Sequence, residues 1–209
     1  IANICANGFV LSVSTRVSAK TLSEFVAFVK TRPGELNYGS GGTGSLTHLA
    51  AALFLHRAGL EMTHIPYKGG ALALNDTLGG QVQMYAASPS EVLGYQDSDR
   101  IRLLGISSNQ RIKQLPNVPA IADIYPGFRA LTWNGVLGPA QMPAPVVNVL
   151  ASEIRKALED PTFVERLVAA GVEPALTTPA NFAAQIVEEH TMWRDVITRA
   201  GILVQCGRR

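Results

Sequence analysis

The stretch that most constrains the fold is LNYGSGGTGSLTH, residues 36–48, where a short strand runs through four glycines into a helix. Such a loop is typical of an anion site, because the free N–H groups of the first helical turn point outward and the helix dipole adds about 0.5 of a positive charge there. Glycine lets the backbone take positive φ and approach a bound group closely. The sequence therefore predicts an anion site over residues 39–45.

Two nucleotide motifs match this loop in part, and each lacks a residue that it needs. Residues 39–44, GSGGTG, fit the dinucleotide pattern G-x-G-x-x-G, but Lys68 follows the next predicted strand, residues 62–66, where an acidic residue should hold the ribose. The glycines also fit the start of a P-loop, but Ser45 and Leu46 occupy the Lys-Ser/Thr positions. A smaller anion such as a carboxylate is favoured. A structural turn and a nucleotide-dependent oxidoreductase remain as alternatives.

Composition excludes several other classes of protein. Of 209 residues, 47% are hydrophobic and 16% charged, which predicts a packed core. The net charge is +2 and no basic run occurs, so nucleic-acid binding is not expected. Cys5 and Cys206 form no metal-ligand cluster, so we expect two unpaired thiols and neither a metal nor a cofactor. The chain begins at Ile1 without a signal-peptide pattern, and we interpret it as a piece of a longer protein.

Strand patterns alternate with helical patterns from about residue 8 to 137, which predicts an α/β fold with a doubly wound, mainly parallel sheet. After residue 138 the pattern changes to three amphipathic helices. The predicted strands are 8–13, 36–38, 62–66, 82–86, 101–106 and 130–137. The predicted helices begin near residues 21, 45, 71, 90, 143, 160 and 178.

Ligands of such sheets bind beyond the carboxyl ends of the strands. Four loops are expected at that edge, residues 39–45, 68–70, 88–90 and 107–108. None carries a carboxylate or histidine suited to acid–base chemistry, which favours binding over catalysis. We expect a carboxylate to accept hydrogen bonds from the N–H groups of residues 42–46. The candidate ligand contacts are Ser40, Gly41, Gly42, Thr43, Gly44, Ser45, His48, Lys68, Gly70 and Ser88.

Several of these candidates also have a purely structural interpretation. Thr43 and Ser45 fit helix caps as well as ligand contacts. His48, one turn into the helix, is favoured as a buried structural histidine over a ligand contact, and His64 is interpreted as structural. Lys68 fits a solvated lysine equally well.

A series of motifs occurs in one order along nearly the whole chain: LNYGSGGTGSLTHLAAALF, HIPYKGG, LNDTLGGQV, LPNVPAIAD, W-x-G, GVEP and a terminal W…AGI. Together they resemble the substrate-binding proteins of tripartite tricarboxylate transporters, the Bug receptors. The resemblance implies a periplasmic, two-lobed clamp that performs no chemistry and delivers a small organic acid to membrane permease subunits. Dicarboxylic or tricarboxylic acids, amino acids and aromatic acids are the implied ligands.

The resemblance also implies a division of the chain. Residues 14–132 would form a complete lobe that holds the glycine loop, whereas residues 1–13 and 133–209 would supply interlobe strands and the helical part of an incomplete second lobe. Family members carry a further N-terminal segment that supplies the opposing anion loop, and many have an acid where Gln83 stands. The apolar faces of the C-terminal helices should then recruit a second copy or leave the segment mobile.

Overall fold

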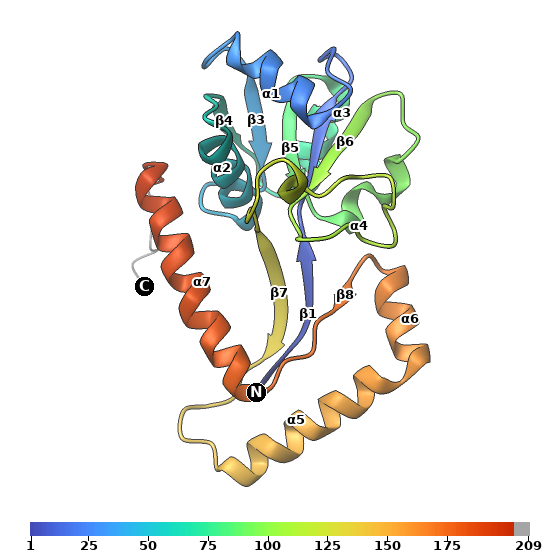
Figure 1. Cartoon of the computed structure of the whole chain (residues 1–209), viewed down its shortest axis with the longest axis vertical. Coiled ribbons are helices and arrows are strands. Elements are labelled where there is room, and N and C mark those ends of the chain that lie inside the picture. Colours follow the sequence, from blue (N-terminus) through green and yellow to red (C-terminus); the bar gives the residue numbers. More distant parts are fainter. Residues whose placement is uncertain (203–209) are drawn as a thin grey trace.

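The computed structural model describes residues 1–202 and contains two sheets (Figure 1). In the larger sheet, of order β4-β3-β5-β2-β6, β3 lies parallel to β4 and β5, and β2 lies antiparallel to β5 and β6. Four strands therefore share one direction, which confirms the predicted α/β fold and mainly parallel sheet. The reversed strand was not predicted. The strands are β2 (Val10–Ser14), β3 (Asn37–Ser40), β4 (Thr63–Pro66), β5 (Met84–Ala87) and β6 (Ile101–Ile106).

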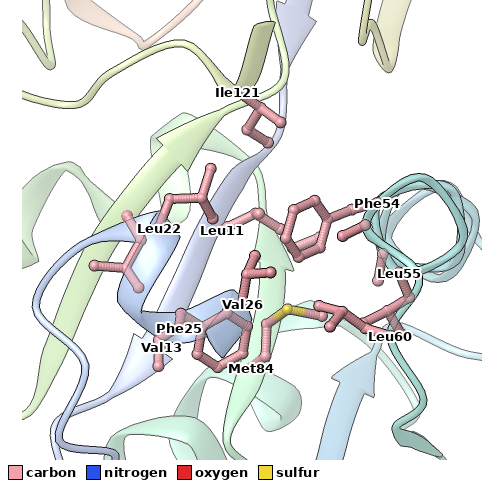
Figure 2. Close-up of a cluster of buried hydrophobic side chains, with 14 of the residues drawn as sticks. Leu11, Val13, Leu22, Phe25, Val26, Phe54, Leu55, Leu60, Met84 and Ile121 are labelled. Atoms are coloured by element: carbon pink, nitrogen blue, oxygen red, sulfur yellow. The ribbon is translucent and has the colours of Figure 1, made fainter. Parts of the chain in front are cut away.

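Helices cover both faces of this sheet, as the doubly wound prediction requires. Strand β5 shows the division, because Met84 and Ala86 join the core under α1 and α2, whereas Tyr85 and Ala87 join the core under α3. Figure 2 shows the first of these cores, in which Phe54 of α2 lies near the side chains of the neighbouring strands. The bounds are α1 (Leu22–Lys30), α2 (Leu46–Ala58), α3 (Gly70–Gly79), α4 (Pro89–Val92), η1 (Leu93–Tyr95) and η2 (Ile121–Asp123).

A smaller antiparallel sheet lies beside the larger one. It has the order β7-β1-β8, with β1 (Ala2–Gly8) between β7 (Leu131–Val136) and β8 (Glu173–Pro174). The chain passes from this sheet into β2 at Phe9. It therefore enters the larger sheet at the edge where the parallel strands end, with Val10 opposite Ala87, and this explains the reversed direction of β2. Residues 10–13, which were expected in the second lobe, thus lie in the larger sheet. The lobe boundaries stay a prediction.

Three C-terminal helices complete the described chain: α5 (Ala144–Glu159), α6 (Pro161–Ala169) and α7 (Pro179–Arg199). Within residues 1–202, no residue of α5 or α6 is buried, and in α7 only Phe182 and Val196 are. None of the helices in residues 1–202 combines the length and hydrophobicity needed to cross a membrane. Cys5 is buried, and Cys206 lies outside the described residues. The large apolar side chains left exposed in this part are Leu137, Val146, Val149, Leu150, Phe163 and Val187.

Candidate functional site

The predicted strand–loop–helix unit is present, with β3 ending at Ser40 and α2 beginning at Leu46. Gly42 and Gly44 take φ values of 132° and 77°, which side chains other than glycine rarely adopt. The hydroxyl of Ser45 caps α2 by accepting a hydrogen bond from the N–H of His48 at 3.3 Å. These local features place the start of α2 at the carboxyl ends of the parallel strands β3, β4 and β5.

Most N–H groups of the loop already donate hydrogen bonds within the chain, so few of them are available to an anion. Within residues 1–202, the N–H groups of Thr43, Leu46 and Thr47 donate to no other group. Of the predicted donors, residues 42–46, only the N–H groups of Thr43 and Leu46 are therefore available within residues 1–202. The N–H group of Thr47, which was not predicted, is available as well. The engaged donors are Gly41 to Thr47 Oγ1 at 2.9 Å, Gly42 to Ser40 Oγ at 3.1 Å, Gly44 to His48 Nδ1 at 3.1 Å and Ser45 to the Gly42 carbonyl at 3.1 Å.

The three candidate hydroxyls of the loop have different roles. Ser40 is buried, and its Oγ accepts from the N–H of Gly42 and donates to the Gly42 carbonyl, so it holds the loop closed. The Oγ of Ser45 lies 3.0 Å from Thr47 Oγ1 in addition to capping α2. Thr43 is exposed, and its hydroxyl has no partner in the described part of the chain. Thr43 is therefore the hydroxyl best placed to meet a ligand.

Two histidines form a stacked pair beneath the loop. The rings of His48 and His64 lie 3.6 Å apart between centroids with 9° between their planes, and Tyr38 stacks on His64 at 5.0 Å. His64 Nε2 lies 2.7 Å from the Oγ of Ser40, so each histidine contacts one side of the loop. His48 is buried, and its assignment as a ligand contact stays a prediction.

The histidine pair is uncharged at neutral pH. Burial lowers the pKa of His48 from 6.5 to about 4, with the charge of His64 as a smaller cause, and burial also lowers the pKa of His64. Because His48 Nδ1 accepts a hydrogen bond from the N–H of Gly44, the proton of the neutral ring lies on Nε2. The pair therefore supports the loop as a neutral acceptor and supplies no positive charge.

Two neighbouring loops approach the glycine loop. A Cβ atom on Gly41 would lie 3.4 Å from the N of Gly70, and one on Gly70 would collide with the carboxylate of Glu91. Glu91 accepts hydrogen bonds from the N–H and Oγ of Ser88, at 2.9 and 2.7 Å, and from Tyr85 Oη at 3.0 Å. The structure thus brings Gly70 and Ser88 towards the loop. The Ser88 hydroxyl, however, donates to Glu91.

Glu91, which comes directly after the predicted loop 88–90, was missed as a residue near this edge of the sheet. The sequence carried its signal, because Ser88-x-x-Glu91 is a capping box that opens α4. Lys68 is exposed and makes no hydrogen bond within residues 1–202, so its assignment as a ligand contact stays a prediction.

The fourth predicted loop, residues 107–108, does not reach the glycine loop. It follows β6, and β5 and β2 lie between β6 and β3 in the sheet. Ser107 is buried, and its Oγ accepts from the N–H of Phe9 at 2.6 Å and donates to the carbonyl of Ala130. Ser107 therefore joins the two segments that cross between the sheets.

Comparisons with known proteins agree with this geometry. The family model for the tripartite tricarboxylate transporter family receptor, TctC, matches residues 1–202. The UPF0065 protein in the tcbD-tcbE intergenic region of Pseudomonas sp. (strain P51) is 36% identical over 190 residues, which are 90% of this chain and 56% of that protein. The chain therefore spans little more than half the length of this curated relative.

Solved structures show the same fold. Rpa4515 of R. palustris, solved with adipate, superposes with a TM-score of 0.83 at 28% identity, covering 97% of this chain and 68% of that one. The periplasmic binding protein BugD superposes with a TM-score of 0.79 at 25% identity, covering 97% and 69%. The predicted likeness to periplasmic binding proteins is confirmed at the level of the fold.

Proposed function

The chain belongs to the tripartite tricarboxylate transporter receptor family, and from this premise we propose that it captures a small organic carboxylate in the periplasm for delivery to membrane permease subunits. The observation that carries the proposal is that the N–H groups of Thr43, Leu46 and Thr47, in the glycine loop and the start of α2, have no acceptor within residues 1–202. They lie beyond the carboxyl ends of parallel strands, where ligands of α/β sheets bind. The adipate in the Rpa4515 structure supports a carboxylate as the ligand class.

Hydrogen-bond energies limit how tightly these three N–H groups can bind a carboxylate. A hydrogen bond to a charged group contributes about 1.5–3 kcal/mol, so two or three of them give roughly 3–9 kcal/mol. Association costs at least ~4 kcal/mol in lost motion. The 209-residue chain should therefore bind a carboxylate with a dissociation constant of about 1 mM or weaker. We propose that residues 14–132 supply one lobe of the site and that tight binding requires the opposing lobe of longer family members.

A titration of the chain with adipate and glutamate tests this proposal. Separate titrations with NAD, NADP and ATP test the alternative, a nucleotide-dependent enzyme. We expect the amide resonances of Thr43, Leu46 and Thr47 to shift with the acids, with saturation near about 1 mM or above. The nucleotides should leave them unchanged, because Lys68 and the Ser45-Leu46 pair stand where ribose and phosphate ligands are needed. Tighter binding of a nucleotide than of any acid would contradict the proposal.

Self-association of the chain is a further part of the proposal. Helices α5 and α6 bury no residue, and apolar side chains such as Val149 and Leu150 are exposed in the described part of the chain. Burying one large apolar side chain stabilises by about 1.5–3 kcal/mol. We therefore expect either a species heavier than 22.3 kDa or fast amide exchange in α5. Size exclusion with light scattering and hydrogen exchange measure both. A monomer at every concentration with slow exchange through α5 and α7 would contradict this expectation.

A further inference from the structure

An apolar groove begins at the first residue of α2. It has a volume of about 400 Å³ and lies between the start of α2, strand β7 and helix α7, which Figure 1 shows beside β7. This volume lies within the range of about 300–1,000 Å³ typical of small-molecule sites. Its lining includes Leu46, Leu131, Trp133, Ile186, Glu189 and Trp193.

Leu46 joins the groove to the carboxylate site. Its N–H is one of the free donors at the start of α2, while its side chain, 42% exposed, lines the groove. A carboxylate on this N–H group would therefore have the rest of its molecule near the mouth of the groove. Among the described residues, Leu46 is the only one that combines these two features.

Two polar groups in the groove wall, Trp133 Nε1 and the Glu189 carboxylate, are paired with each other. Thr132 and His190 also line the groove, and their side chains make no hydrogen bond within residues 1–202. Trp133 packs edge-to-face on the buried ring of Phe182, at 5.0 Å and 87°, and its Nε1 donates to Glu189 Oε2 at 2.7 Å. The other carboxylate oxygen of Glu189 accepts from Gln185 Nε2 at 2.9 Å. At this pair a charged or hydroxylated ligand group would compete with existing bonds, whereas a hydrocarbon group meets the apolar side chains of Leu46, Leu131 and Ile186, which make up much of the rest of the lining.

We propose that the groove receives the hydrocarbon body of the ligand, so that the chain selects carboxylates with an aromatic or alkyl body over small hydroxylated acids. The inference rests on the proposed function, since the carboxylate is placed on the donors at the start of α2. It adds the chemical class of the ligand and assigns Leu46, Trp133 and Trp193 as specificity residues.

The two tryptophans of the chain, Trp133 and Trp193, both line the groove, so their fluorescence reports its occupancy directly. Three probes separate the groove from the carboxylate site: phenylacetate, malate and the uncharged 2-phenylethanol. We expect phenylacetate to change the emission and to bind about tenfold more tightly than malate, because burial of part of its ring adds apolar contact. The alcohol should change the emission only at higher concentration.

A matched pair of variants locates the effect. Leu46→Asn keeps the backbone N–H and makes the groove mouth polar, and we expect it to reduce the preference for phenylacetate over malate by about fivefold. Leu72→Asn is the control, because Leu72 is also in the first turn of a helix, α3, is 49% exposed and is absent from the groove lining. Thermal melts of both variants should show that they fold.

Each other outcome is decisive. Equal affinity for malate and phenylacetate, with no effect of Leu46→Asn, would overturn the groove assignment and leave the carboxylate receptor intact. Equal affinity for 2-phenylethanol and phenylacetate, with no response to malate, would overturn the carboxylate receptor itself. Tryptophan emission that changes with protein concentration and not with any probe would mean that a second copy covers the groove, which also overturns the inference.

Discussion

Replacing Leu46 with proline is expected to reduce carboxylate binding tenfold or more while α2 stays folded. Leu46 is the first residue of α2, where proline is well tolerated, and its N–H has no partner within residues 1–202. Ser45, with φ −66° and ψ 158°, already has the extended conformation preferred before proline. The change removes a single hydrogen bond to a charged ligand, a loss of about 1.5–3 kcal/mol, or roughly 10- to 150-fold in affinity.

Leu46→Ala is the matched control, because it shortens the same side chain and keeps the N–H. The ratio of the adipate affinities of the two variants isolates the N–H group, and both can be measured by following amide shifts at Thr43 and Thr47. If Leu46→Pro binds adipate with the same affinity as Leu46→Ala, the start of α2 is not the carboxylate site. Gly44 offers no comparable test, since its φ of 77° and its bond to His48 mean that proline there would disrupt the loop itself.

Much of this arrangement could be predicted because its signals are local. Ser45 as an N-cap, Gly59 with φ 63° at the end of α2 and the glycines of the loop are all encoded within a few residues of the structure that they form. The capping box at Ser88 is equally local and was available in the sequence. Such features define the position and the ends of the helices that frame the site.

The parts that could not be predicted depend on contacts between distant segments. His48 and His64 meet because β3 and β4 pair in a register that places Tyr38 opposite His64, and no local pattern encodes that register. The free N–H groups of the loop follow from the positions of the Thr47 and His48 side chains, which decide which donors are already used. The reversed direction of β2 was hidden for a similar reason, since a strand buried on both faces has the same pattern in either direction.

Acidification from pH 7 to pH 4.5 is expected to destabilise the chain through the histidine pair. The pKa of His48 is lowered to about 4 in the folded chain, against 6.5 for the unfolded chain, so the unfolded state takes up the proton first. The stability that comes from the neutral ring is fully present above pH 6.5, falls as the pH drops, and is lost by about pH 4. The lowered pKa of His64 acts in the same direction. We expect a loss of about 1–3 kcal/mol in the free energy of unfolding over this range.

Denaturant unfolding at pH 7, 6, 5 and 4.5 measures this loss, and His48→Gln is the variant to compare. Glutamine does not titrate, and its carbonyl can accept the hydrogen bond from the N–H of Gly44, so the variant should lose less stability on acidification than the wild-type chain, whatever its stability at pH 7. Because Gly44 donates to His48 Nδ1, protonation of this nitrogen must break that bond. The imidazole resonance of His48 and the amide resonance of Gly44 should therefore titrate together, below pH 5. A His48 resonance that titrates near 6.5 while the Gly44 amide stays unchanged would show that the ring does not hold the loop.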